Sequence, residues 1–154
     1  MAIRQNFNRK EIFQMSNKTN LAFFNAYLEL DKACAKALGI SKSGVTSYIN
    51  CLVESRYAPD RNEVLRKLIK YRKFRNIIAH EAGAMSEFNE ITKEDIKWVN
   101  KFASKMTRKQ DPISRYERKL KMEEIWRKIV LIGSIVAGAV AVIGIIIVII
   151  NSFK

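Results

Sequence analysis

The sequence predicts an all-α protein: a bundle of four main helices, followed by a long helix that becomes a single C-terminal transmembrane helix. Two observations carry this prediction. Apolar side chains recur at helical spacing in several segments, and no segment shows the alternation of a β-strand. The stretch from Ile129 to Ile150 contains no charged residue. A chain of 154 residues is long enough for one compact domain and such an appendage.

The first helix should follow a flexible, basic arm formed by residues 1–15. A helical pattern begins at Ser16 and ends near Gly39, a residue suited to the position that follows a helix. Its apolar side chains are Leu21, Phe24, Leu28 and Leu38. A short second helix is expected from Val45 to Glu54. The residues that it should bury are Ile49, Leu52 and Val53.

The third helix should begin at a break formed by Pro59 and Asp60. Asp60 is followed three residues later by Glu63, a spacing that resembles a capping box. We therefore expect a long helix from Arg61 to about Glu81. Its apolar residues are Val64, Leu65, Leu68, Ile69, Tyr71, Phe74, Ile77 and Ile78.

The remaining helices are also marked by their start signals. Thr92 with Asp95 predicts another N-terminal cap. The helix after it carries one apolar face, made of Ile96, Val99, Phe102 and Met106. Asp111 and Pro112 then break the chain. The last helix should start near Pro112 and run unbroken into the apolar stretch, so that the helical domain covers residues 16–110.

The apolar stretch 129–150 would be roughly 30 Å long as a helix, which matches the hydrocarbon core of a bilayer. A buried core helix of this length normally shows a polar stripe, and this one shows none. The net charge is +13, and only Lys154 follows the stretch. The segment 111–128 is a basic juxtamembrane helix, with Arg115, Arg118, Lys119, Lys121, Arg127 and Lys128.

By the positive-inside rule, this basic cluster places the N-terminal domain in the cytoplasm. The sequence thus predicts a single-pass membrane protein that contacts membrane lipid and ends in a short tail, 151–154. Cys34 and Cys51 form no metal-ligand pair, so we interpret them as small core residues. One histidine without a thiolate cluster does not build a usual zinc site, so we expect no metal and no other cofactor.

Residues 72–81, RKFRNIIAHE, hold the candidate site. Arg75 is a permanent cation suited to phosphate, and His80 can exchange a proton near neutral pH. RNA cleavage needs a base for the 2′-hydroxyl, an acid for the leaving oxygen and a cation for the charged transition state. An Arg/His pair that is doubled by a two-fold dimer would supply all three without a metal.

The helical period constrains how these residues can meet. Asn76 and His80 share a face at i,i+4 spacing, whereas Arg75 lies about 140° around the helix from His80. Arg75 and His80 can therefore converge only on a substrate between them, at a break in the helix, or across a dimer interface.

The motif and the bundle resemble the HEPN superfamily, whose members carry R-x(4–6)-H in a four-helix bundle. Here four residues separate Arg75 from His80, and Asn76 stands where that family often has a polar residue. The stretch from about Phe23 to Ser114 is also similar to an uncharacterised bacterial domain family. The segments that carry this second similarity are GVTSYIN, YAPDRNEVL, YRKFRNIIAHEAGAM and DPIS.

The HEPN resemblance implies a homodimer, or a higher homo-oligomer, that binds RNA. For active members it implies a metal-independent endoribonuclease, often in a toxin–antitoxin or phage-defence setting with an antitoxin or defence partner. Arg75 would then hold the phosphate, His80 would be the general acid/base and Asn76 would orient His80 or the phosphate. Arg72 and Lys73 would add positive field for RNA. Inert members of the superfamily serve as dimerisation or RNA-binding modules.

Two other functions fit the sequence. Residues 34–49, CAKALGISKSGVTSYI, resemble a helix-turn-helix with Gly39 at the turn and Lys and Ser side chains for DNA. A recognition helix would project those side chains outward, whereas a bundle helix would be covered. Alternatively, the protein is an inert membrane adaptor that oligomerises through small residues in the apolar stretch. Those residues are Gly133, Ala137, Ala141 and Gly144.

Overall fold

The structure is a computed structural model that describes the backbone of residues 9–152. Side chains are described for residues 16–140 and for 144, 146, 149, 151 and 152. The chain divides after Arg115 into two compact units, and each is described here by itself. Residues 1–8, which belong to the predicted arm, and 153–154, at the end of the predicted tail, lie outside the described residues.

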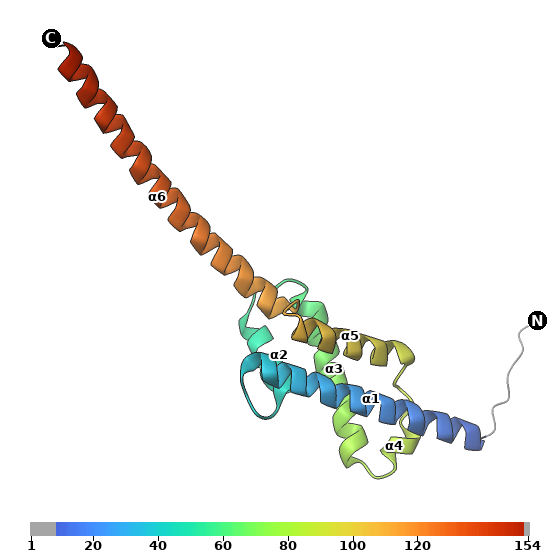
Figure 1. The fold of residues 1–154 in the computed structure, drawn as a ribbon. Helices are drawn as coiled ribbons and strands as arrows, with labels where there is room; N and C mark the ends of the chain where they lie inside the picture. Colours follow the sequence, from blue (N-terminus) through green and yellow to red (C-terminus); the bar gives the residue numbers. More distant parts are fainter. Residues whose placement is uncertain (1–8, 153–154) are drawn as a thin grey trace, which may run out of the picture. The chain divides into compact units, whose positions relative to one another are not determined.

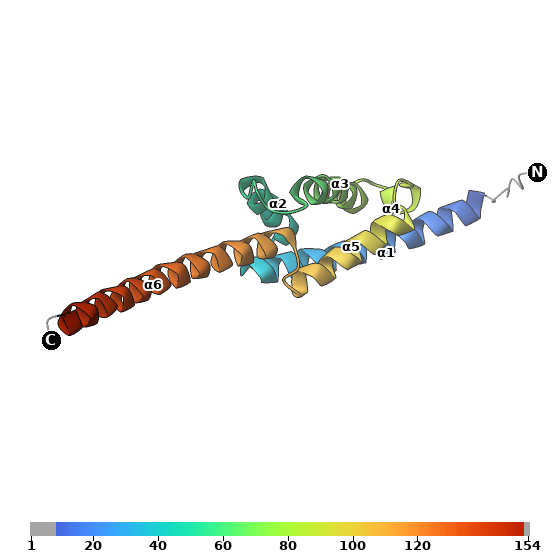
Figure 2. The same cartoon turned by 90° about the horizontal axis from the view of Figure 1, so that it is seen from above.

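The described residues form α-helices and contain no strand, which confirms the all-α part of the prediction. The helices are α1 (Arg9–Leu38), α2 (Gly44–Glu54), α3 (Arg61–His80), α4 (Ala84–Glu87), α5 (Lys93–Thr107) and α6 (Pro112–Ser152). Helices α1 and α5 lie side by side in one layer (Figure 1). Helices α2, α3 and α4 cover one side of this pair, as the view from above shows (Figure 2).

Aromatic rings join the two layers. Phe23 of α1 meets Tyr71 and Phe74 of α3 edge to face, with ring centroids 5.7 and 6.2 Å apart. Tyr71 also lies 5.3 Å from Trp98 of α5, which stacks on Phe102 at 4.9 Å. Such pairs contribute about 0.5–1.5 kcal/mol each beyond their buried area. They fix where α3 crosses the α1–α5 pair.

The buried face of α1 differs from the one that the leucine spacing predicts. Leu21 and Leu28 are 49% and 37% exposed. The residues buried instead are Phe23, Ala26, Tyr27, Leu30 and Cys34. These side chains form one stripe along α1, which packs on α2, α4 and α5. The large rings of Phe23 and Tyr27 occupy this stripe, and Leu21 and Leu28 lie outside it. The helix also begins at Arg9, earlier than the expected Ser16.

Helices α1 and α2 approach closely at Gly44. A Cβ atom on Gly44 would overlap the backbone oxygen of Asp31 and the backbone nitrogen of Ala35. The Asp31 side chain reaches α2 as well, because its Oδ1 accepts a hydrogen bond of 2.8 Å from the Val45 amide. The first turn of α2 is thus capped by a side chain of α1 rather than by its own Ser43.

A capping box was expected at the start of both α5 and α3, and the structure shows it only at α5. At α5 the capping box is confirmed: the Asp95 amide donates to the Thr92 hydroxyl at 3.2 Å, and the Thr92 amide donates to the Asp95 carboxylate at 3.0 Å. At α3 the capping box is wrong. Asp60 has a left-handed backbone (φ 58°) and makes no side-chain cap. Its carboxylate instead accepts a hydrogen bond from Arg115 at 2.9 Å.

Asp95 links α5 to α3. Its Oδ1 accepts hydrogen bonds from the Tyr71 hydroxyl at 2.9 Å and from Lys70 at 3.1 Å. Burial alone would raise the pKa of Asp95, but the hydrogen bonds from Thr92, Tyr71 and Lys70 outweigh it and lower this pKa. The native state therefore prefers the ionised carboxylate.

This lowered pKa predicts a pH-dependent stability. A carboxyl group with a depressed native pKa contributes stability above its unfolded pKa of about 4, and loses it as pH falls through the lower native pKa. We expect Asp95→Asn to lower the midpoint of urea unfolding at pH 7 and to have a smaller effect below about pH 4. Asp60→Asn, at an exposed ion pair, is the control and should change little. An equal loss for Asp95→Asn at both pH values would contradict the prediction.

The prediction of a transmembrane helix over 129–150 is contradicted. Within the described part of the chain, no helix combines the length and the apolar character needed to cross a membrane. Charged side chains occupy α6 as far as Lys128. The predicted location as a single-pass membrane protein is therefore contradicted as well. The side chain of Ile150, at the end of the predicted span, lies outside the described set.

Candidate functional site

Helix α3 carries all five residues that the sequence singles out. One side of it is buried against the core through Val64, Leu68, Tyr71, Phe74 and Ile78. The helix is continuous from Arg61 to His80, and Glu81 then turns the backbone to an extended conformation. Because no break separates Arg75 from His80, a break in the helix does not bring them together.

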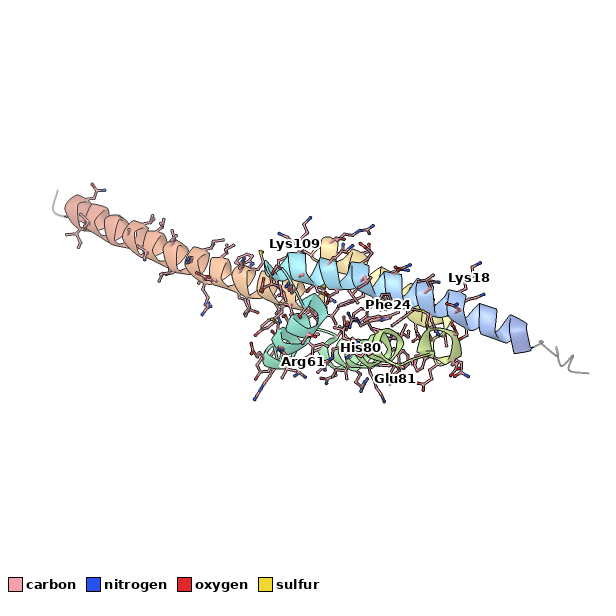
Figure 3. All side chains as sticks on the ribbon, turned by 90° about the horizontal axis from the view of Figure 1, so that it is seen from below. Lys18, Phe24, Arg61, His80, Glu81 and Lys109 are labelled. Atoms are coloured by element: carbon pink, nitrogen blue, oxygen red, sulfur yellow. The ribbon has the colours of Figure 1, made fainter. Side chains whose placement is uncertain are left out.

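His80 lies in a shallow depression of about 500 Å³ on the outer face of α3. This surface, the His80 depression, is lined by Ile69, Arg72, Lys73, Asn76, Ile77, His80 and Glu81. All of these residues belong to α3 or directly follow it, so among the described residues no second element lines the depression. Figure 3 shows His80 and Glu81 on the far side of the unit from Lys18 and Lys109.

The His80 side chain is exposed, and within the described part of the chain it has no hydrogen-bond or ion-pair partner. Arg72 and Lys73 beside it also lack a partner there. Glu81 is the one acidic residue in the lining. The depression is therefore net positive, and its imidazole is open to solvent and to any bound anion.

Arg75 lies elsewhere. Its guanidinium sits 6.0 Å from the centre of the Phe24 ring of α1, and it donates a 3.3 Å hydrogen bond to the Asn76 side chain. It lines a second cavity of about 210 Å³ between three helices, here called the inter-helix cavity. The lining residues are Tyr27, Leu28 and Asp31 of α1, Ser43 and Thr46 at the start of α2, and Arg72, Arg75 and Asn76 of α3.

The structure thus brings four of the predicted residues together and separates the fifth. Lys73 and His80 line the His80 depression, and Arg75 lines the inter-helix cavity. Arg72 and Asn76 line both. Because Arg75 and His80 point in different directions from the helix, they line two different cavities, and these cavities share Arg72 and Asn76.

Sequence reasoning missed Tyr27 and Asp31, which supply the α1 side of the inter-helix cavity. Tyr27 is only 4% exposed. Burial is the main cause that raises the pKa of its hydroxyl, and the negative charge of Asp31 raises it further, whereas Arg75 and Arg72 act to lower it. All three charged groups line the same cavity as this hydroxyl. The spacing of four residues between Tyr27 and Asp31 places them on one helix face, and this signal was available in the sequence.

Acidic, cysteine and histidine side chains do not gather elsewhere in the described part of the chain. No group of three or more of them there is placed to hold a metal ion. Cys34 is buried and Cys51 is half-buried, and both are free thiols. The side chains that could take part in catalysis or binding are therefore those on α3 and around the inter-helix cavity.

Residues 21–132 match a family of unknown function, DUF6548. The chain belongs to DUF6548. The DUF6548 region includes every residue of both cavities and also the stretch 23–114, which carries the similarity to an uncharacterised bacterial family. No significant match is found among curated proteins or among solved structures. Membership of DUF6548 by itself assigns no activity.

Proposed function

We propose that this protein is a metal-independent endoribonuclease of the HEPN type that works as a homodimer. The observation that carries the proposal is the exposed imidazole of His80, without a partner in the described part of the chain, in a depression that Arg72 and Lys73 make basic. Beside the cations Arg72 and Lys73, this imidazole is placed to meet a bound phosphodiester.

The chemistry follows from these residues. One His80 imidazole takes the proton of the ribose 2′-hydroxyl, whose oxygen attacks the adjacent phosphorus. The bond from phosphorus to the 5′-oxygen breaks, and a second His80, from the partner subunit, protonates that oxygen. The products are a 2′,3′-cyclic phosphate and a 5′-hydroxyl. Arg72, which lines the depression with His80, stabilises the charged transition state, Arg75 adds positive charge from the adjoining cavity, and Lys73 adds attraction for the RNA backbone.

The open form of the His80 depression supports a dimer. Its lining comes from one helix, and Ile69 at its edge is 45% exposed. A second copy packed on this face would cover Ile69 and place two His80 side chains around one substrate. This arrangement would supply the acid and the base that a single histidine cannot provide at the same time.

The helix-turn-helix alternative receives less support. Helix α2, which would be the recognition helix, contains no Lys or Arg. Its Val45, Tyr48, Ile49 and Leu52 are buried against α1 and α3. Little of its surface would be available for a DNA groove.

The test is cleavage of single-stranded RNA and tRNA by the full-length purified chain in EDTA. We expect fragments that end in 2′,3′-cyclic phosphate, a rate that EDTA does not change, and a dimer by light scattering. A toxin or defence role with an antitoxin would follow if expression arrests growth in cells. Intact RNA at high protein concentration would refute the nuclease and leave a catalytically inert oligomerisation module as the better description.

A further inference from the structure

The outer face of α5 carries a row of exposed cations. The row consists of Lys97, Lys101, Lys105 and Arg108. Within the described part of the chain, none of these four side chains forms an ion pair or a hydrogen bond. By the helical period they lie within an arc of about 80° and extend over about 16 Å of the helix. These four residues are here called the α5 basic face.

The α5 basic face points away from both the core and the candidate site. The buried residues of α5 lie on its opposite side, at Asp95, Val99, Phe102 and Met106. Lys109, which directly follows Arg108, lies on the far side of the unit from His80 (Figure 3). The His80 depression is lined by α3 and the residue after it, in the other layer of helices. The two basic surfaces are therefore separate.

The side chains on this face restrict the class of partner that it can bind. Helix α5 has no large apolar side chain that is exposed, whereas protein interfaces rely on aromatic anchors and are depleted in lysine. Its Trp98 is half-buried in a stack on Phe102, so the bases of a single strand would find no exposed ring to stack on. Double-stranded RNA needs neither feature, because proteins recognise it mostly through its phosphates and its shape.

We propose that the α5 basic face binds the phosphate backbone of double-stranded RNA. A duplex carries about one charge per 1.7 Å of its axis, so phosphates are available to all four cations. Lysine and arginine donate charge-assisted hydrogen bonds to phosphate oxygens, and no ion pair within the described residues has to break first. The choice of RNA rests on the proposed function. The face would give that nuclease a second contact to structured RNA, away from His80.

One acidic side chain limits where the backbone can lie. Glu94 is exposed in the first turn of α5 and falls within the same arc as the cations. Its charge repels phosphate, so the RNA backbone should run from Lys97 toward Arg108. Glu94→Gln should therefore strengthen duplex binding.

The experiment is fluorescence anisotropy with a labelled RNA duplex of about 16 base pairs. The full-length chain carries His80→Ala, so that the RNA stays intact whether or not the natural chain cleaves it. We expect the logarithm of the binding constant to fall with the logarithm of salt concentration with a slope of about −3.6 or steeper, because each of the four contacts contributes about −0.9. Changing the duplex sequence should not alter the affinity, since phosphates carry no sequence information.

Variants of one residue locate the contact on α5. Lys101→Gln should weaken duplex binding about 3- to 10-fold and reduce the steepness of the salt dependence by about 0.9. Lys101→Arg keeps the charge and should retain both the affinity and the slope. Asn100→Ala changes an exposed residue of the same helix, about 60° outside the arc, and should alter neither.

Several outcomes would overturn this inference. An unchanged affinity for Lys101→Gln would remove the face from the contact. An equal loss for Arg66→Gln, exposed on α3 in the other layer, would mean that the charge effect is diffuse or that the duplex lies on the His80 side. If Lys101→Gln costs more affinity for the single strand, for a DNA duplex or for poly-glutamate, the face serves that partner instead. Duplex binding without RNA cleavage by the natural chain would refute the nuclease alone, and cleavage without duplex binding would refute the α5 assignment alone.

Discussion

His80→Ala should reduce the rate of RNA cleavage by about 10²- to 10⁴-fold, because it removes the group that moves the proton at both ends of the reaction. The fold should survive. The imidazole is exposed at the end of α3 and bonds to no described residue, so its loss should affect helix stability only through the helix dipole, by about 0.3–1 kcal/mol. The measurement is the single-turnover rate on a short RNA, with circular dichroism as the check on folding.

A control separates chemistry from a general loss of binding. Asn100→Ala changes an exposed polar residue on α5 and should leave the rate unchanged. Added imidazole should restore part of the activity of His80→Ala, since it replaces the missing acid/base, and it should not help Arg75→Gln. If His80→Ala cleaves RNA as fast as the natural protein, His80 is not the general acid/base and the proposed mechanism fails.

Gly44→Ala should destabilise the first unit by about 3 kcal/mol, the upper part of the range for overpacked sites. The added methyl group would overlap two backbone atoms of α1, at Asp31 and Ala35, and neither atom can move without shifting the helix. For a domain of this size, such a loss lowers the midpoint of thermal unfolding by on the order of 10 °C. Differential scanning calorimetry of the full-length chain would measure it.

The matched control is Gly133→Ala. Gly133 also lies in a helix, but a Cβ atom there meets nothing within 4 Å. Alanine should stabilise that helix by about 0.5–1 kcal/mol relative to glycine. An unchanged midpoint for Gly44→Ala would mean that α1 and α2 are not held as closely as the structure describes.

Much of the fold could be predicted from local signals. Apolar spacing predicted the helices of the first unit except α4, and the Thr92–Asp95 capping box marked the start of α5 within one residue. These signals act within one or two turns of helix, so sequence alone carries them. The short α4 was not predicted, because four residues are too few to show a period.

Features that depend on tertiary contact could not be predicted in this way. Both Phe23 and Leu21 are apolar, and only packing against α3 decides that the ring is buried and the leucine exposed. The cap that Asp31 provides for α2 joins residues fourteen positions apart. The inter-helix cavity is made in the same way, because its walls come from three segments that no local pattern connects.

The transmembrane prediction over 129–150 was wrong, since no helix in the described part of the chain is both long and apolar enough to cross a membrane. The directions in which Arg75, Asn76 and His80 leave α3 could be predicted, because a continuous helix fixes them by geometry alone.

Arg72 and Asn76 line both cavities, and this shared wall has a thermodynamic consequence. A ligand that draws the Arg72 guanidinium toward one cavity lowers the positive potential in the other. The two binding free energies are then coupled, and the coupling is reciprocal by linkage. An anion bound in one cavity should weaken the binding of an anion in the other, by the same factor in either direction.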